Sequence, residues 1–464
     1  MPSDDDGRFG ERDIAEIAND IFLQSALETT IIRGAELEFF LTRLRAALLR
    51  LATANAADLA EISDLVAGLF CAMAEQCFLN EYIYAQSDEE TEAASRLRGL
   101  LARKLSAREE ISPVLPAAVA AYFPLHLLPA AESLLAAAWP QYAADLLRQQ
   151  VREPLDETVD RRDIPALTPI DDEVSKRVMQ QYEENPYPRW NVNPLAAAAA
   201  ELQRNADTEG RAEVVLSQDI LVAGCGTGEH PFDIAQKSPQ ARVLAIDLSR
   251  TSLAYARRKT REHGLRNVEY AQADIMNLAA FGRTFDRIEA VGVLHHLADP
   301  AAGWRVLLSL LAPAGVMRVG LYSETARRSI VAARALIAER GLQARPEDIR
   351  AFRQVLIQAR HEPRWETIIT SVDFYSMSGC RDMLFNVMEH RFNIAEIAAF
   401  LSTNGLAFLG FELDAETVAR FQQQHPAVDA LLNLDHWESF EAANPLTFRN
   451  MYQFSIRRTA QALP

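Results

Sequence analysis

The stretch Asp219-Ile-Leu-Val-Ala-Gly-Cys-Gly-Thr-Gly-Glu229 decides how this chain folds. Four apolar residues run into three glycines spaced two apart, and a helix-like segment opened by His230-Pro231 follows; proline is favoured in a first helical turn. Glycine adopts backbone angles that are closed to other residues and lets a ligand approach the main chain. A second apolar run, Arg242–Asp247, ends in an acid 21 residues after Gly226, and in dinucleotide-type folds an acid about 20 residues on binds the ribose hydroxyls. The pattern predicts a strand, a glycine turn and a helix beside a nucleoside site.

The spacing of the glycines indicates which class of α/β domain this is. Hydride-transferring Rossmann domains usually show G-x-G-x-x-G, which seats a pyrophosphate at a helix N-terminus. Here the spacing is G-x-G-x-G, and VAGCGTG followed by AIDLS resembles the class I S-adenosylmethionine-dependent methyltransferases. A glycine turn in some other α/β domain is the alternative. The resemblance covers about residues 172–460, and its specific motifs lie between 219 and 297.

Charge and composition exclude several classes of protein. Lys and Arg number 47 against 64 acids, so the net charge is −17, which argues against a general nucleic-acid binder because such proteins neutralise phosphates. No run of about 18 apolar residues occurs, and the acidic N-terminus lacks the features of a signal peptide. The four cysteines show no C-x-x-C pair and no grouping with histidine at zinc spacing. We therefore expect a cytoplasmic protein with reduced thiols, no metal site and no membrane span; a homodimer stays open.

Composition divides the chain into three parts. Residues 1–155 are predicted to form an α-helical domain, because apolar residues recur at three- and four-residue steps, as from Leu37 to Leu48. We find no period of 34 residues, so a tetratricopeptide-like solenoid is kept only as an alternative. Residues 156–212 are expected to be a linker and a cofactor-covering segment, and residues 213–464 the α/β domain.

Downstream of the glycine turn, apolar runs alternate with helical segments, which implies a parallel sheet with ligands at the carboxyl ends of its strands. We predict an α/β Rossmann-like methyltransferase domain of seven strands, preceded by the all-α domain. Residues 324–392, approximately, are too long for a simple crossover and are predicted to be a helical insertion above the ligand face. Further strands are expected at 268–273, 285–293, 316–322, 406–413 and, antiparallel, 447–456.

The segment QYEENPYPRW, residues 181–190, is dense in aromatic residues, proline and arginine. It resembles the segment before the first strand in bacterial methyltransferases that carry an N-terminal helical or tetratricopeptide domain, where it often folds over the cofactor. Tyr182, Tyr187, Arg189 and Trp190 are therefore candidates for covering the active site. A rigid turn that docks the linker on the core is the alternative.

The resemblance implies S-adenosylmethionine as the cofactor. Asp247 would take the ribose hydroxyls, because a carboxylate accepts two hydrogen bonds side by side, and Asp274 would meet the adenine amino group. The family usually has an acid two residues before the first glycine, where this chain has Val222, so the contact to the cofactor's amino group is in doubt. Glu229 is a candidate to compensate; a carboxylate favoured by the helix dipole is the alternative. The expected cofactor-binding residues are Ala223, Gly224, Cys225, Gly226, Thr227, Gly228, Asp247, Leu248, Asp274, Ile275 and Val291.

His295 and His296 follow the fourth predicted strand, where methyl donor and acceptor meet in this family. Neighbouring strand residues point opposite ways, so we expect only one to face the site. Histidine suits proton abstraction near neutral pH, and a residue that only shapes the pocket is the alternative. From position and residue type, the predicted substrate-binding residues are Tyr182, Tyr187, Arg189, Tyr375, Arg381 and His390.

These features together predict a methyltransferase acting on oxygen or nitrogen of a small molecule, or of a peptide or protein presented by the helical domain. The alternative is a non-catalytic scaffold that binds the cofactor or has lost it. The complete glycine motif with both downstream acids favours the enzyme, since a scaffold need not retain them.

Overall fold

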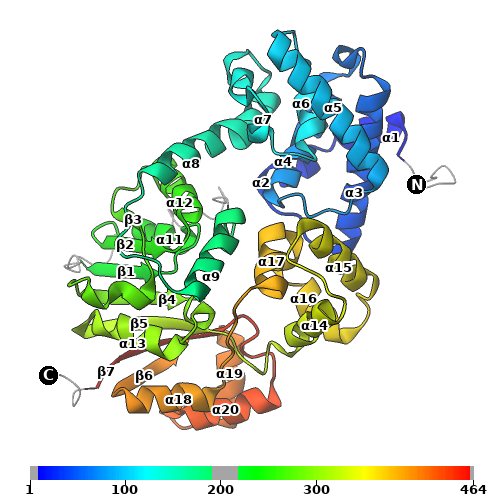
Figure 1. Cartoon of the computed structure of the whole chain (residues 1–464). Coiled ribbons are helices and arrows are strands. Elements are labelled where there is room, and N and C mark those ends of the chain that lie inside the picture. Colours follow the sequence, from blue (N-terminus) through cyan, green and yellow to red (C-terminus); the bar gives the residue numbers. More distant parts are fainter. Residues whose placement is uncertain (1–8, 191–217, 460–464) are drawn as a thin grey trace, which may run out of the picture. The chain divides into compact units, whose positions relative to one another are not determined.

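Figure 1 shows the computed structural model, which describes residues 9–190 and 218–459. The second part of the predicted covering segment, residues 191–212, lies outside the described residues. The chain divides into two compact units. The helical unit contains residues 9–159 and 337–385, and the sheet unit contains 160–190, 218–336 and 386–459.

The helical unit is built around α4 (Asp64–Leu79), in which every residue from Val66 onward is buried. Its other N-terminal helices are α1 (Glu11–Ala18), α2 (Ile21–Thr29), α3 (Ala35–Ala54), α5 (Asp88–Ala107), α6 (Val114–Ala120), α7 (Gln141–Leu147) and α8 (Glu153–Arg162). The predicted all-helical character is confirmed. A tetratricopeptide array, which repeats a helical pair every 34 residues or so, is not confirmed, because the helices range from seven residues in α6 to 20 in α3 and α5.

Residues 337–385 join this unit from far along the chain. They contain the end of α14 (Arg328–Glu339), then α15 (Pro346–Gln358), α16 (Glu366–Ile369) and α17 (Met377–Phe385). The guanidinium of Arg353 donates to both carboxylate oxygens of Glu38, at 3.0 and 2.7 Å, and both side chains are almost fully buried. This stretch lies within residues 324–392, approximately, which were predicted to be a helical insertion of the α/β domain. Its middle instead packs on the N-terminal helices, because the buried Glu38–Arg353 pair joins residues 315 positions apart.

The sheet unit contains seven strands in the order β3-β2-β1-β4-β5-β7-β6, as predicted in number. β1 to β5 are parallel, and β7 runs antiparallel between β5 and β6. The last strand was predicted to be antiparallel, and this is confirmed. The strands are β1 (Asp219–Ala223), β2 (Arg242–Asp247), β3 (Val268–Gln272), β4 (Phe285–Val291), β5 (Leu311–Leu321), β6 (Leu406–Phe411) and β7 (Tyr452–Arg458).

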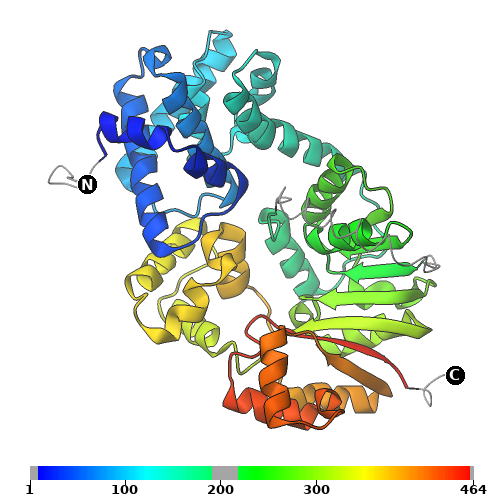
Figure 2. The same ribbon diagram turned by 180° about the vertical axis from the view of Figure 1, so that it is seen from behind.

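Helices cover both faces of this sheet because its buried strands are apolar on both sides. Within β1, Leu221 lies in one apolar core and Val222 in the other, as the alternation of strand side chains requires. α11 (Glu229–Lys237) and α12 (Arg250–Glu262) pack on the Val222 side, and the remaining helices include α13 (Pro300–Ser309), α18 (Ile394–Thr403), α19 (Ala415–Gln424) and α20 (Leu434–Ala443). Figure 2 shows this sheet from behind. The predicted cap of α12 is confirmed: the Ser249 hydroxyl accepts from the amide of Ser252 at 3.0 Å.

The predicted boundary at residue 155 falls inside α8, which continues to Arg162. The chain then follows the open edge of β3 and enters α9 (Glu173–Glu184). Within the described ranges, no helix is both long and apolar enough to cross a membrane.

Candidate functional site

The glycine turn joins β1 to α11 and is tied to β2. The backbone N–H groups of Gly224 and Cys225 both donate to the carbonyl oxygen of Ile246, at 2.9 Å each. Gly226 has a φ of +53°, a conformation that disfavours side chains. A Cβ at this position would lie 2.6 Å from the carbonyl oxygen of Tyr187. Glycine is therefore required here both by the backbone angle and by the close approach of the preceding segment.

Asp247, the last residue of β2, holds this turn through its carboxylate. Oδ2 accepts from the N–H of Gly226 at 2.8 Å, and Oδ1 accepts from the N–H of Ser249 at 2.9 Å. Burial raises the pKa of Asp247, and the backbone hydrogen bonds oppose that rise. A carboxylate offers about four lone-pair sites, so each oxygen keeps an acceptor position. The remaining positions suit two neighbouring hydroxyl groups.

Asp274 follows β3 and is fully buried. Its Oδ1 accepts from the N–H of Met276 at 3.0 Å, which caps the 3-10 helix Ile275–Ala280. Its Oδ2 is also buried and finds no hydrogen-bond partner among the described residues. Burying a carboxylate oxygen without a donor is costly, and buried polar atoms are nearly always paired. The position therefore calls for a donor from outside the described chain.

The turn after α9 lies directly on the glycine turn. The hydroxyl of Thr227 donates to the carbonyl oxygen of Pro188. The indole N–H of Trp190 donates to the carbonyl oxygen of Thr227 at 2.9 Å, and the Trp190 ring packs against Phe232 with centroids 5.0 Å apart. Trp190 is buried. The segment from 181 to 190 thus reaches the predicted site, as a turn anchored to the loop that the glycines form.

His295 lies in the short 3-10 helix Leu294–His296 after β4 and is completely buried. Its ring stacks on Tyr322 with centroids 3.8 Å apart, and neither ring nitrogen has a hydrogen-bond partner among the described residues. Burial lowers the pKa of His295 well below its usual range, and the positive charge of the nearby Arg327 lowers it further. His295 therefore stays neutral near pH 7.

His296 has a defined orientation. Its Nδ1 lies 2.7 Å from the carbonyl oxygen of Met388. A carbonyl oxygen only accepts, so Nδ1 carries the proton and Nε2 of the neutral ring keeps its lone pair. A histidine held by one nitrogen and basic at the other is the arrangement of a general base. The structure thus distinguishes the two histidines, which sequence alone did not.

Glu389 lies between Met388, which bonds to His296, and His390, which bonds to His295. Its side chain is 1% exposed and pairs with Arg327 at 2.6 Å and Arg334 at 3.1 Å. The Arg327 guanidinium lies 3.6 Å from the ring centre of Tyr322, the ring on which His295 stacks. Neither arginine was among the predicted site residues, because arginine side chains usually face solvent.

The structure also shows what surrounds Val222, the position at which the resemblance led us to expect an acid. Its Cα partner on the neighbouring strand is Glu289, which is fully buried. A Glu289 carboxylate oxygen lies 3.1 Å from Nε2 of His230 and 3.4 Å from the Arg318 guanidinium. Burial raises the pKa of Glu289, but the hydrogen bond from His230 and the neighbouring arginines outweigh it and lower the pKa overall. A charged carboxylate is thus present one strand away, next to the first turn of α11.

The other predicted residues fall into two groups. Tyr182, Tyr187, Arg189 and His390 belong to the sheet unit, and the Tyr182 hydroxyl accepts from the side-chain amide of Asn386 at 3.3 Å. Tyr375 and Arg381 belong to the helical unit. Tyr375 is 3% exposed, so its side chain offers little surface to a substrate. Ala223, Cys225, Gly228, Leu248 and Val291 lie at the carboxyl ends of β1, β2 and β4 or in the turns that follow them.

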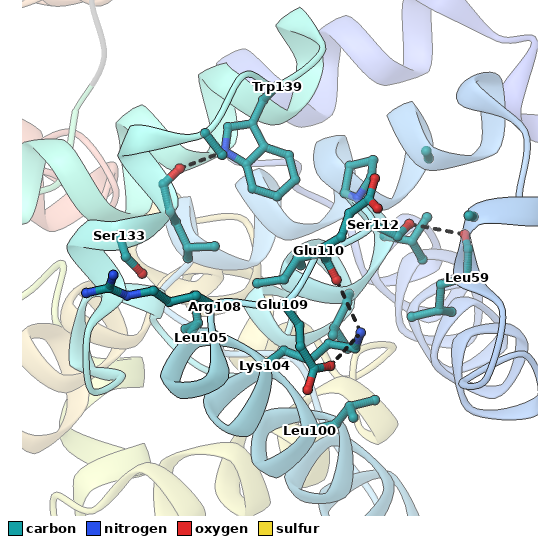
Figure 3. A pocket seen from close by; sticks show the side chains of 18 of the residues that line it. Leu59, Leu100, Lys104, Leu105, Arg108, Glu109, Glu110, Ser112, Ser133 and Trp139 are labelled. Carbon is teal, nitrogen blue, oxygen red and sulfur yellow. Dashed lines mark hydrogen bonds and ion pairs between the residues drawn. The ribbon is translucent and has the colours of Figure 1, made fainter.

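A separate pocket of about 1230 Å³ lies within the helical unit, between the end of α5 and the start of α6. Figure 3 shows that its polar side chains are bonded to neighbouring groups of the same unit: the Lys104 ammonium lies 3.3 Å from the Glu109 carboxylate, and the Trp139 indole N–H donates to the backbone carbonyl oxygen of Leu134 at 2.6 Å. None of its described lining residues has a buried side-chain donor or acceptor without a partner. It thus lacks a feature comparable to the Asp274 oxygen.

Comparison with known proteins points to the same part of the chain. Residues 220–315 match the family model of a methyltransferase domain. Together with the seven-stranded sheet, this match confirms the predicted fold class. The matched range contains the glycine turn, Asp247, Asp274 and both histidines, whereas the helical unit lies outside it.

Individual relatives cover less of the chain. An uncharacterized protein of Synechococcus sp. is 30% identical over 267 residues, which is 52% of this chain and 60% of that protein. A ubiquinone biosynthesis O-methyltransferase of Methylocella silvestris is 35% identical over 106 residues, 23% of this chain and 40% of that protein. The chain thus spans between 40% and 60% of the length of these two relatives. Among solved structures, PKMT2 from Rickettsia typhi in complex with AdoHcy has a TM-score of 0.41 and 18% identity, covering 53% of this chain and 49% of that one.

Proposed function

We propose that this chain is an S-adenosylmethionine-dependent methyltransferase whose acceptor atom is an oxygen or nitrogen of a small molecule, a peptide or a protein. The site lies at the carboxyl ends of the parallel strands, where ligands bind in open α/β sheets. The match of residues 220–315 to a methyltransferase domain supports the reaction class.

The observation that carries the proposal is the buried Oδ2 of Asp274, which has no hydrogen-bond partner within residues 9–190 and 218–459. An adenine amino group would supply the N–H donor that this oxygen lacks. Asp247 keeps acceptor positions for the two ribose hydroxyls after bonding to Gly226 and Ser249. The two acids and the glycine turn between them form a set of acceptors and open backbone that fits an adenosine group.

When bound, S-adenosylmethionine would supply an electrophilic methyl group. What the protein must add is alignment of the acceptor and removal of its proton if it carries one. We assign proton removal to Nε2 of His296, since Nδ1 is committed to Met388. His295, neutral and stacked on Tyr322, is assigned the role of holding the His296 ring in place, because the two imidazole rings are in edge contact with centroids 4.4 Å apart.

The acceptor is proposed to contact the segment from 181 to 190 and His390. The backbone N–H of His390 donates to the carbonyl oxygen of His295, the residue before the proposed base, at 2.8 Å, which supports this proposal. Arg189, Tyr187 and Tyr182 belong to the turn that lies on the glycine loop or to the helix before it. Arg381 is kept as a proposed substrate contact from the helical unit, whereas the burial of Tyr375 argues for a packing role.

The helical unit is proposed to present or select the acceptor. All four cysteines of the chain are free and buried, which supports a reducing, cytoplasmic location.

Calorimetric titration of the full chain tests the cofactor assignment. S-adenosylmethionine and NAD are titrated separately into the wild type, the Asp247→Asn variant and the control Asp286→Asn. Asp286 accepts a backbone N–H at 2.9 Å like Asp247, but at the opposite end of the strands. We expect wild type and control to bind S-adenosylmethionine and not NAD, and Asp247→Asn to bind it at least tenfold more weakly. Absence of binding to the wild type would instead support an interaction scaffold.

A further inference from the structure

The residues after α8 extend the sheet at the edge of β3. The carbonyl oxygen of Pro165 accepts from the N–H of Gln272 at 2.8 Å, and the N–H of Leu167 donates to the carbonyl oxygen of Gln272 at 2.9 Å. Pro169, two residues after Leu167, is bonded as well: its carbonyl oxygen accepts from the side-chain amide of Asn277 at 3.0 Å. This short strand-like segment, residues 164–169, is thus bonded to both sides of Asp274 in the sequence.

Upstream, the same segment is held by an ion pair. The Asp160 carboxylate accepts two hydrogen bonds from the Arg261 guanidinium, both at 2.8 Å. Asp160 is on α8 and Arg261 is on α12. The path from 160 to 169 is therefore fixed at its start by this ion pair, in which Nη1 of Arg261 donates to both carboxylate oxygens, and along β3 by backbone bonds.

Thr168 reaches Asp274 itself. Its hydroxyl oxygen accepts from the backbone N–H of Asp274 at 2.7 Å. This bond fixes the backbone of Asp274, whose Oδ2 is buried and has no partner in the described part of the chain. A carboxylate held in this orientation distinguishes a ligand that presents a hydrogen-bond donor from one that presents an acceptor. A donor pairs with the buried oxygen, whereas an acceptor leaves that oxygen unpaired.

We propose that Thr168 is a positioning residue that fixes Asp274 and thereby makes the site selective for adenine over hypoxanthine; this inference rests on the proposed function. Adenine presents an amino group, which donates. Hypoxanthine carries a carbonyl oxygen at the same position, which only accepts and would face the Asp274 oxygen unfavourably. If Asp274 moves once Thr168 is changed, the hydrogen bond between the adenine amino group and Asp274 contributes less to binding. The ribose contacts at Asp247 remain.

The test compares two ligands whose bases differ at C6, an amino group against a carbonyl, and in the proton that hypoxanthine carries on the neighbouring N1. S-adenosylhomocysteine and S-inosylhomocysteine are titrated into the full-length wild type, Thr168→Val, Thr168→Ser and Asn277→Ala. Valine removes the hydroxyl at nearly constant shape, serine restores it, and Asn277→Ala loosens the same segment without touching the Asp274 amide. Thermal unfolding of each variant confirms that it is folded.

We expect the wild type to prefer the adenine ligand. Thr168→Val should reduce that preference by about 2- to 12-fold, the effect of one hydrogen bond, mainly through weaker binding of the adenine ligand. Thr168→Ser and Asn277→Ala should keep the wild-type preference. An unchanged preference in Thr168→Val, or an equal loss in Asn277→Ala, would overturn the role of the Thr168 hydroxyl. A wild type that binds neither ligand would instead overturn the proposed function.

Discussion

Gly226 is the point where the segment from 181 to 190 touches the glycine turn, so Gly226→Ala tests how the site is assembled. The new Cβ would lie 2.6 Å from the carbonyl oxygen of Tyr187, too close for an undisturbed backbone. The φ of +53° adds a second cost, because residues with a side chain disfavour this region. Relief of the clash must move the Tyr187–Trp190 turn away from the loop.

The magnitude follows from these contacts. The left-handed conformation costs roughly 1–2 kcal/mol for a residue other than glycine. Movement of the turn also breaks the hydrogen bonds from Thr227 to Pro188 and from Trp190 to Thr227, each with a net value of about 0.5–1.5 kcal/mol. The expected total is about 2–5 kcal/mol. Gly264 provides the matched control: its φ is +68°, but a Cβ there would meet nothing within 4 Å. Gly264→Ala should therefore cost only about 1–2 kcal/mol.

Hydrogen exchange of the full chain, read by mass spectrometry, measures the loss of stability in the segment from 181 to 190. In Gly226→Ala, the backbone amides of residues 181–190 should lose protection by at least about tenfold, because even the lower estimate exceeds the free energy of one factor of ten. In Gly264→Ala their protection should stay at the wild-type level. Equal behaviour of the two variants would refute the argument that the turn packs on Gly226.

Three further predictions concern other contacts. His296→Asn should lower kcat by about 100-fold or more, as expected for loss of a general base, while calorimetry should show an unchanged cofactor affinity. His295→Phe keeps a ring to stack on Tyr322 and should lower kcat by less than tenfold. A larger loss of kcat in His295→Phe than in His296→Asn would contradict the assignment of the base. Arg353→Met should destabilise the helical unit by about 3–5 kcal/mol in urea unfolding, because it leaves Glu38 buried without its partner, and adding Glu38→Gln should recover part of the loss; a full loss in the double variant would show that the arginine acts through packing alone. Burial raises the pKa of Glu75 to about 8, so the folded state holds a proton that the unfolded state releases above about pH 4.5. The free energy of unfolding should therefore fall as the pH rises from about 4.5 to about 8, and Glu75→Gln should remove this pH dependence. An unchanged pH dependence in Glu75→Gln would show that another group titrates.

Local sequence determined the sheet unit to a large extent. The apolar runs of β1 to β5 are each followed by a turn or helix signal, and the glycine turn with Asp247 and Asp274 lies where the spacing predicts. Ser249 caps α12 as expected. These features depend on residues close together in the chain, so periodicity and capping rules are sufficient to find them.

Long-range pairing was not predictable from one sequence. The Glu38–Arg353 pair links helices from the two ends of the helical unit, and nothing near either residue marks it as buried. The bond from Asp274 to Thr168 spans 106 positions, and Thr168 lies in a stretch that reads only as a linker. The choice between His295 and His296 likewise depends on Met388, which comes from a distant segment.

A crystal structure of the chain with S-adenosylhomocysteine tests the central claim most directly. We predict that the adenine amino group lies within hydrogen-bond distance of Oδ2 of Asp274, and that both ribose hydroxyls donate to Asp247. The homocysteine end should lie along Gly224–Gly228. A ligand bound elsewhere in the chain, or bound here with Oδ2 of Asp274 still unpartnered, would contradict the account.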